Sequence, residues 1–363
     1  MNVTIDQRKA NDVLRDVILG NKSSYRPKTE FCKEIESVIL GTHVTYRYIL
    51  VTGLLSKAVN QDCNPLALQA GSDLDGAYDA RSVCHNVLVP IERELLANRL
   101  GGSNEPFLNK PARYPSLDIK NPVRRGNDER LLKCTIKILS GVSSSDEALS
   151  CLKDCIYYIF KREPRDFINL LSTDVGNHQQ TDLINFARLL LGKSFEGESS
   201  ALLVGLTFSL FSEFSGGFDV RVHKVNQAGT SSNEILDIDV YDGERVVYTI
   251  EVKDKRFSSH DVEHAVNKAL KYGIRVIMFA IGPNGSLMDS TIGDLTAIWA
   301  KKGVSVYFVD VLSHFVSTIS YLSIDIQNVI KIIDYHTDKA KMKDDTIKHI
   351  GSIFRELDWI KQK

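Results

Sequence analysis

The residues best suited to chemistry lie in the stretch LDIDVYDGERVVYTIEVKDK, residues 236–255. Side chains alternate along a β-strand, so Asp237 and Asp239 share one side of a first strand, and Glu251 and Lys253 share one side of a second. An Asp-Gly pair between the two strands predicts a tight hairpin. The hairpin would bring Asp237 or Asp239 beside Glu251 and Lys253, and the alternation does not choose between the two aspartates.

Two neighbouring carboxylates repel each other, and loss of hydration adds to the cost. They are stable together when a cation lies between them. Carboxylate oxygens are the hard ligands that Mg²⁺ prefers, and a bound metal acidifies water and stabilises charge on a phosphoryl group. Lys253 can orient the attacking water or stabilise negative charge. A lone E-x-K occurs by chance on solvated strand ends, so the interpretation depends on the hairpin aspartate and the flanking apolar runs.

The elements that position these residues follow from apolar periodicity. Helices are predicted over 42–59 and 129–191, and the apolar run 200–214 predicts a further helix that ends at Gly216-Gly217. Strands are predicted over 218–225, 236–240, 246–252, 275–281 and 304–311, with helices over 259–272 and 289–302.

An antiparallel meander followed by strands that alternate with helices indicates a mixed sheet with helices on both faces. We therefore expect an α/β fold, in the sense of an α+β mixed sheet. The expected organisation is a mostly helical N-terminal region over 1–195 and a core with C-terminal helices over 196–363.

With its flanking elements, the hairpin resembles the PD-(D/E)xK nuclease superfamily. In that superfamily a sheet-borne Asp, followed by Glu-x-Lys on the next strand, forms the metal and hydrolysis site. Asp237 matches the first position best, with Asp239 as a competitor, and Leu236 stands where a proline is usual. The resemblance implies a restriction-endonuclease-like core in which Asp237, Glu251 and Lys253 are catalytic.

A narrower resemblance is to the SacI-type restriction endonucleases. It depends on the blocks AYDARSVCHNVLVP (77–90) and LGGSNEPFLNKPARY (100–114), and on the stretch from LDIDVYDG to FAIG (236–282). These blocks follow one another in the family's order and span most of the chain.

This resemblance implies a type II restriction endonuclease, a homodimer that cuts double-stranded DNA at a palindromic, GAGCTC-like site. It also implies a Mg²⁺ cofactor, for which Mn²⁺ can substitute, and a cognate DNA methyltransferase in the same restriction-modification system. The implied metal ligands are Asp237, Glu251 and the backbone carbonyl of Val252. Asp239 is a further possible ligand, and so is Glu198, because some relatives keep a metal-facing Glu at the start of the helix before the sheet.

A second surface is needed to contact bases, and the Gly/Asn/Pro/Arg-rich segment 71–127 is the candidate. Five cationic residues and one acidic residue lie between Phe107 and Arg125. Arg can bridge guanine O6 and N7, Asn can do the same for adenine, and Lys neutralises phosphates. A solvated basic loop is the alternative. The candidate contacts are Arg81, His85, Asn86, Asn104, Asn109, Lys110, Arg113, Tyr114, Arg124 and Arg125.

Lys255 and His260 closely follow the active-site strand and can meet phosphates. His260 and His264 are four residues apart, a spacing compatible with a metal site. No third ligand of suitable type is obvious in the sequence, so two surface histidines on a helix are the simpler interpretation.

Composition limits the class of protein only loosely. Lys plus Arg is 45 and Asp plus Glu is 46, so any DNA-binding surface must be a local basic face. The six cysteines contain no CxxC pair. The N-terminus lacks the apolar core of a signal peptide, and no stretch approaches the ~20 apolar residues of a membrane span. We expect a cytoplasmic protein.

Two other functions are compatible with the sequence. One is a repair or defence nuclease of the same superfamily that recognises DNA structure or modification. The other is a non-catalytic DNA-binding protein with a nuclease fold, against which the intact Asp237, Glu251 and Lys253 argue.

Overall fold

The computed structural model describes residues 2–21, 24–121, 127–171, 180–224 and 234–360. The chain divides into two compact units, Met1–Asp166 (unit 1) and Phe167–Lys363 (unit 2). The sequence-based boundary at 195/196 lies further along the chain, and the helix Gln180–Leu191 packs within unit 2.

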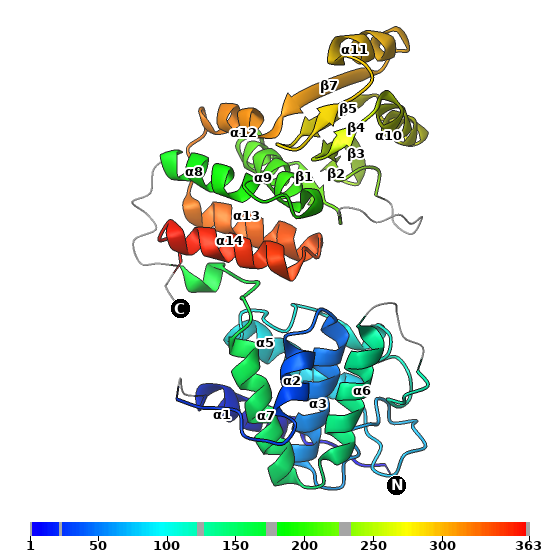
Figure 1. Ribbon diagram of the computed structural model, residues 1–363, viewed down its shortest axis with the longest axis vertical. Helices are drawn as coiled ribbons and strands as arrows, with labels where there is room; N and C mark the ends of the chain where they lie inside the picture. The colour runs from blue at the N-terminus through cyan, green and yellow to red at the C-terminus, as the bar shows by residue number, and fades with distance from the viewer. Residues whose placement is uncertain (1, 22–23, 122–126, 172–179, 225–233, 361–363) are drawn as a thin grey trace. The chain divides into compact units, whose positions relative to one another are not determined.

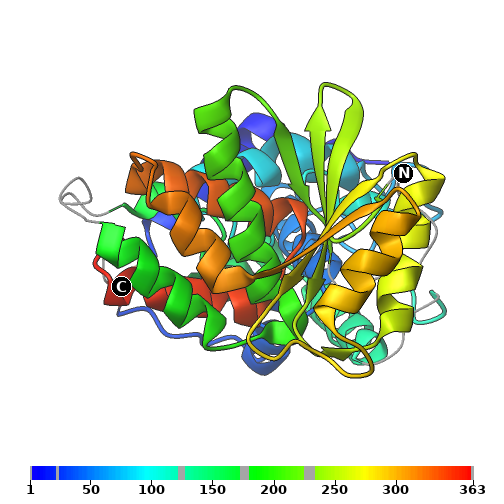
Figure 2. The ribbon, with the colours of Figure 1, turned by 90° about the horizontal axis from the view of Figure 1, so that it is seen from above.

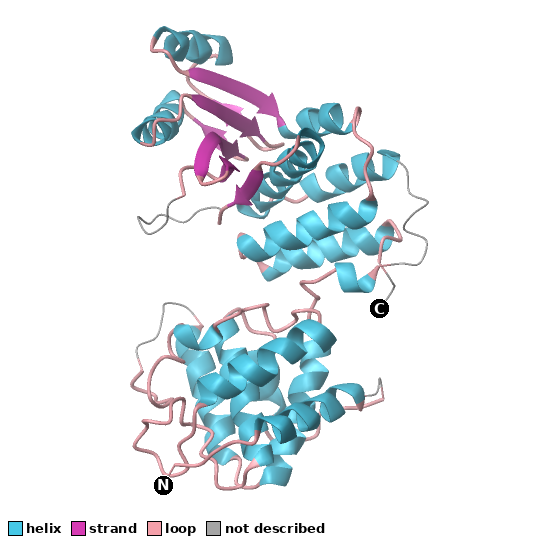
Figure 3. Cartoon of the chain, turned by 180° about the vertical axis from the view of Figure 1, so that it is seen from behind, coloured by secondary structure: helices cyan, strands magenta, loops and turns pink. Residues whose placement is uncertain are grey.

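The described part of unit 1 is built from helices and loops (Figure 3). Its central helix is buried on most of its sides, as expected for a helix that neighbours surround. The elements are α1 (Gln7–Leu19), α2 (Cys32–Ile39), α3 (Val44–Val59), α4 (Ala80–Val83), the π-helical turn η1 (Cys84–Leu88), α5 (Val89–Leu95), η2 (Pro106–Leu108), α6 (Asp128–Gly141) and α7 (Ser145–Phe160). Helix α3, which falls within the helix predicted over 42–59, packs against α1, α2, α6 and α7.

The Gly/Asn/Pro/Arg-rich segment is less irregular than its composition suggests. Helix α4, the turn η1 and helix α5 follow one another without a gap over 80–95. Pro90 does not end this run; it stands in the first turn of α5, directly after the π-helical turn η1. The described residues 96–121 of the segment are mostly loop and turn.

Unit 2 contains a five-stranded sheet (Figure 1). Its elements are η3 (Ile168–Leu170), α8 (Gln180–Leu191), η5 (Phe195–Gly197), α9 (Glu198–Ser215), β1 (Asp219–Val222), β2 (Ile238–Asp242), β3 (Arg245–Lys253), β4 (Arg256–Phe257), α10 (Ser259–Lys271), β5 (Val276–Ile281), β6 (Ser286–Leu287), α11 (Ile292–Lys301), β7 (Ser305–Asp310), α12 (Val311–Ile319), α13 (Ile326–Lys339) and α14 (Asp344–Glu356).

The strand order in this sheet is β1-β2-β3-β5-β7. Strands β1, β2 and β3 pair antiparallel, whereas β3, β5 and β7 pair parallel, so the predicted mixed sheet is confirmed. The hairpin between β2 and β3 closes through a two-residue turn in which Gly243 has a φ of 59°. Glycine adopts this left-handed conformation without the steric cost that a side chain brings.

Helices cover both faces of the sheet, as the order of elements predicted (Figure 2). One face packs on α9 and α12 through Ile238, Ile250 and Met278. The other packs on α10 and α11 through Ile277 and Phe279. Since side chains alternate along a strand, Thr249 and Glu251 face the α10–α11 side.

Candidate active site

The hairpin places the predicted carboxylates side by side. Ile238 pairs with Ile250 and Asp239 with Thr249, so Asp237, one residue earlier, lies opposite Glu251. The Asp237 carboxylate accepts a hydrogen bond from the backbone N–H of Val252 at 2.8 Å. This places an aspartate against the E-V-K end of β3.

Glu251 and Lys253 form an ion pair on the same face of β3. Lys253 Nζ lies 2.8 Å from Glu251 Oε1, and the two side chains are 12% and 19% exposed. They are therefore shielded from bulk water yet still reachable from it. The structure brings Asp237, Glu251 and Lys253 together, as the hairpin predicted.

The two aspartates that the sequence left open have different surroundings. Asp239 is fully buried, and its carboxylate accepts from His223 Nε2 at 2.9 Å, Ile235 N at 2.8 Å and Thr249 Oγ1 at 2.5 Å. Leu236 N is a further donor at 3.4 Å. The oxygens of Asp239 are therefore already occupied by protein donors.

Asp237 is partly exposed, and within the described residues Val252 N is the one hydrogen-bond donor to its carboxylate. Desolvation by the surrounding protein raises the pKa of Asp237 above its usual range, and the nearby Glu251 carboxylate raises it further. A carboxylate in this situation gains from a cation beside it.

The donor set fits a magnesium ion. Mg²⁺ commonly takes one or two protein carboxylates and fills its remaining positions with water and substrate phosphate. Asp237 and Glu251 supply two such carboxylates, and the Val252 carbonyl follows Glu251 in the same strand. Among the residues that the structure describes, no three Asp, Glu, His or Cys side chains are grouped as a metal site made of protein ligands alone.

The residue after Lys253 fixes the end of β3. Asp254 accepts from the Asn284 backbone N–H at 3.0 Å, and its other oxygen accepts from the Ser194 hydroxyl. Gly282 N donates to the Lys253 carbonyl at 3.0 Å. A Cβ on Gly282 would lie 2.4 Å from Asp254 Oδ1, so a side chain there would disturb this junction.

Glu198 stands at the start of α9, as the sequence indicated, and it is buried. Its carboxylate accepts from the backbone N–H of Lys343 at 3.0 Å and from the Thr346 hydroxyl. These contacts anchor the N-terminal end of α14, so this carboxylate is engaged with a helix end rather than free for a metal.

Three of the candidate DNA contacts in unit 1 belong to one polar group. Arg81 lies 3.2 Å from Glu105 Oε2, and His85 lies 3.6 Å from Glu105 Oε1. The Asn104 amide oxygen accepts from Arg93.

The other unit 1 candidates lie apart from this group or beyond the described residues. Asn86 bonds to Gln7 of α1 at 3.2 Å. The remaining described candidates lie on the loop after η2, where Asn109, Lys110 and Arg113 are exposed and Tyr114 is half-buried. Arg124 and Arg125 lie outside the described residues.

The candidates that follow β3 are on the surface of unit 2. Lys255 is exposed, and the His260 side chain is 87% exposed with Glu263 at 3.9 Å. His264 is also exposed on α10. Within the described chain, these two histidines form no group with a third metal-ligating side chain.

Several residues at these sites were missed by sequence reasoning. Glu105 lies inside the GGSNEPF stretch, but an acid was not sought on a surface expected to be basic. Asp254 follows directly after Lys253, yet its partners are 30 and 60 residues away in the sequence. Nothing in a local pattern indicates such contacts.

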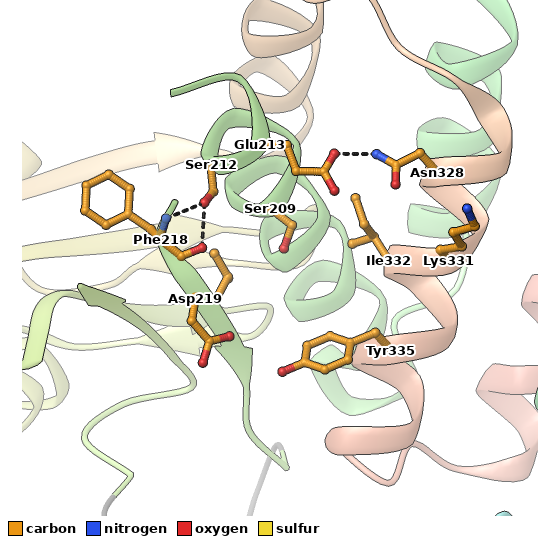
Figure 4. Close-up of a pocket in the computed structure, with 10 residues that line it drawn as sticks. Ser209, Ser212, Glu213, Phe218, Asp219, Asn328, Lys331, Ile332 and Tyr335 are labelled. Carbon is orange, nitrogen blue, oxygen red and sulfur yellow. Dashed lines mark hydrogen bonds between the residues drawn. The ribbon is translucent and has the colours of Figure 1, made fainter. Parts of the chain in front are cut away.

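A cleft of about 250 Å³ in unit 2 lies apart from the carboxylates (Figure 4). Its walls come from α9, β1 and α13, with Ser212, Asp219 and Tyr335 among them. These elements cover the α9 face of the sheet, whereas Glu251 faces α10 and α11. The cleft is therefore separate from the candidate active site.

Comparison with known families decides the class of protein. The SacI restriction endonuclease N-terminal domain matches residues 9–163, and the SacI restriction endonuclease C-terminal domain matches residues 176–283. The chain belongs to the SacI restriction endonuclease family. As a member of this family it is a DNA-binding nuclease, and Asp237, Glu251 and Lys253 lie inside the range matched by the SacI C-terminal domain. No curated protein matches the chain.

Within the described ranges, no helix combines the length and the apolar composition needed to cross a bilayer.

Proposed function

We propose that this SacI-family chain is a Mg²⁺-dependent type II restriction endonuclease with a PD-(D/E)xK core. Its hydrolytic site would consist of Asp237, Glu251 and Lys253. The observation that supports this best is the placement of Asp237 beside the Glu251–Lys253 ion pair, with one protein hydrogen-bond donor to its carboxylate in the described chain. Asp239 is the weaker candidate because its four donors leave no oxygen for a metal.

Each side chain has a distinct role in this proposal. Asp237 and Glu251, with the Val252 carbonyl, would hold the ion. When bound, Mg²⁺ supplies an acidified water and neutralises charge on the scissile phosphate. Lys253 Nζ, held 2.8 Å from Glu251 Oε1, would orient the attacking water and stabilise the negative charge that develops on the phosphate.

The proposal extends to the DNA and to partners. A palindromic target, GAGCTC-like if the chain follows the family's namesake, suits a homodimer because each protomer reads an equivalent half-site. Unit 1 would contact bases, while Lys255 and His260 would meet phosphates. A cognate methyltransferase would protect the host's own copies of the site.

The first test is cleavage of unmodified phage DNA with Mg²⁺, with Mn²⁺, and with EDTA. Discrete bands that require the metal are expected. A smear, or cleavage of modified DNA alone, would instead favour a structure- or modification-dependent nuclease. Binding with no cleavage under either metal would exclude the enzyme and favour a non-catalytic DNA-binding protein.

The second test separates the active-site assignment from the activity itself. Lys253→Ala should reduce cleavage at least about a hundredfold, the usual effect of losing one charge-stabilising group, while DNA binding persists. The matched control is Lys271→Ala on the exposed end of α10, which should cut normally. Full activity of Lys253→Ala would show that the assignment is wrong.

A further inference from the structure

Unit 1 buries a carboxylate that holds one loop by its backbone. Glu92, 1% exposed, accepts from the Gly101 and Gly102 backbone N–H groups at 3.1 Å each, and from the Tyr48 hydroxyl at 2.6 Å. The Tyr48 oxygen in turn accepts from Ser103 N at 2.9 Å. Three successive backbone amides are thereby fixed by one Glu–Tyr pair.

The other side of the same loop is fixed by Arg47, which is fully buried. Its guanidinium donates to the Leu100 carbonyl at 2.7 Å and to the Gly41 carbonyl. Gly101 has a φ of 139° and lies so close to Val44 that an added Cβ would come within 2.8 Å of it. The loop therefore has a closely defined backbone position.

Holding a loop with a buried ionisable side chain costs folding free energy. Burial raises the pKa of the Glu92 carboxyl, which shows that its charged form is disfavoured there. Buried ionisable groups add little net stability compared with apolar packing of the same volume. A rigid loop of this kind is instead suited to fixing the residues that follow it, which are Asn104 and Glu105.

Those two residues complete a polar group on the surface, which we call the Glu105 cluster: Arg81, His85, Arg93, Asn104 and Glu105. Arg81, His85 and Arg93 come from α4, the π-helical turn η1 and α5, and they converge on the loop. The side chains of Arg81, His85 and Glu105 are 53%, 54% and 39% exposed. The cluster therefore presents hydrogen-bond donors and an acceptor side by side on the surface of unit 1.

The carboxylate is the informative member of the cluster. Exposed ion pairs of this kind stabilise a fold by only about 0–1 kcal/mol, and a negative charge opposes phosphate binding. In a major groove, however, Glu accepts from an exocyclic amino group such as that of cytosine, and an oriented Arg bridges guanine O6 and N7. A surface that only neutralised phosphates would have no use for Glu105.

We propose that Glu105 is a specificity-determining residue that accepts a hydrogen bond from a base amino group in the major groove of the target DNA and orients Arg81 beside it. Glu92 and Tyr48 are the positioning residues that hold its loop. This inference rests on the proposed function in one respect, namely that the chain recognises a defined duplex sequence.

The test is selection from a pool of random-sequence DNA duplexes, in EDTA so that no cleavage occurs, with the full chain. Wild type is compared with Glu105→Ala and with the control Glu129→Ala. The control also removes an exposed carboxylate paired to a cation in unit 1, that of Lys133. Glu105→Gln, which keeps the shape and loses the charge, is tested in parallel.

Wild type and Glu129→Ala should enrich one and the same motif. Glu105→Ala should lose discrimination by about tenfold or more at one base pair of each half-site and keep it elsewhere, with unchanged affinity for non-specific duplex. Identical motifs for Glu105→Ala and Glu129→Ala would overturn the inference. So would a uniform loss of affinity at all sequences in both Glu105 variants. If wild type enriches no motif, the failure lies with the proposed site-specific function.

The positioning role has its own readout. Tyr48→Phe removes the hydroxyl that links Glu92 to Ser103 and should relax the same base pair as Glu105→Ala, to a smaller extent. Tyr158→Phe in α7 removes a hydroxyl elsewhere in unit 1 and should leave the motif intact. A Tyr48→Phe protein that selects the wild-type motif unchanged would refute the loop-holding role.

Discussion

Both units contain carboxylates shielded by protein, and the way each is partnered differs. Glu92 in unit 1 and Asp239 in unit 2 are buried. Their carboxylates accept hydrogen bonds from three and four donors respectively. Asp237 is partly exposed, and within the described chain its carboxylate accepts one hydrogen bond. The two carboxylates with several hydrogen-bond donors hold backbone in place. Asp237, with one donor, lies beside a second carboxylate, where a cation would stabilise both.

The largest effect should come from neutralising Asp237, the carboxylate with one hydrogen-bond donor. Asp237→Asn keeps the size of the side chain but removes the negative charge that a metal needs. Cleavage should fall by on the order of a thousandfold, and Mg²⁺ should no longer raise the melting temperature. Single-turnover cleavage and thermal unfolding with and without Mg²⁺ measure the two effects. If Mg²⁺ still raised the melting temperature of this variant, Asp237 would not be the metal ligand that separates it from Asp239.

Substitution of Asp239, the neighbouring carboxylate with four hydrogen-bond donors, should instead have a large effect on folding. Asp239→Ala leaves Ile235 N, Thr249 Oγ1 and His223 without their acceptor in a buried place. Breaking such a network costs about 3–5 kcal/mol. Urea unfolding should show this loss, and unit 2 should become the less stable unit. A variant as stable as wild type would mean that Asp239 is not structural.

Asp254 combines a structural role with a place next to the active site, because it holds the end of β3 and directly follows Lys253. Asp254→Ala should lower the cleavage rate by about tenfold through displacement of Lys253, since small errors of placement are costly to a reacting geometry. Asp254→Asn keeps one acceptor oxygen for the Asn284 N–H but turns a donor toward the Ser194 hydroxyl, so it should recover only part of the rate. The rate constant under saturating DNA is the measurement, and a change confined to DNA affinity would contradict the role.

The smallest effect concerns the stability of the metal-free protein. Protein burial and Glu251 raise the pKa of Asp237 above its unfolded value, so ionisation of this group opposes folding. Its contribution to stability falls as pH rises from the unfolded pKa through the folded one. Metal-free Asp237→Asn should therefore be more stable than wild type at pH 8, by on the order of 1 kcal/mol, and equal to it at about pH 4. Denaturation at both pH values tests the sign.

Local periodicity was sufficient to predict the hairpin and the shared face of Glu251 and Lys253, because both depend only on alternation and a turn. It could not choose between Asp237 and Asp239. That difference comes from donors such as His223, which approach Asp239 from outside the hairpin pattern. The same limit applies in unit 1, where Tyr48 and Glu92 are 44 residues apart and no short pattern links them.

The composition of segment 71–127 was misleading for a different reason. Gly and Pro indicate loop on average, yet Pro90 stands inside the continuous helical run over 80–95. The basic character of the segment also favoured its cations as DNA contacts. The role of Glu105 could not be predicted from the sequence, because only the fold places Arg81 and His85 beside it.

The sheet topology also has a kinetic consequence. Asp237 and Val252 are 15 residues apart and meet across a two-residue turn, so the carboxylate pair can assemble as soon as one hairpin closes. The contacts that hold the end of β3 reach Asn284 and Ser194, and β5 must add in parallel before they form. We expect the acidic pair to form early in folding and the lysine to be positioned late, which would leave the newly made chain inactive until its sheet is complete.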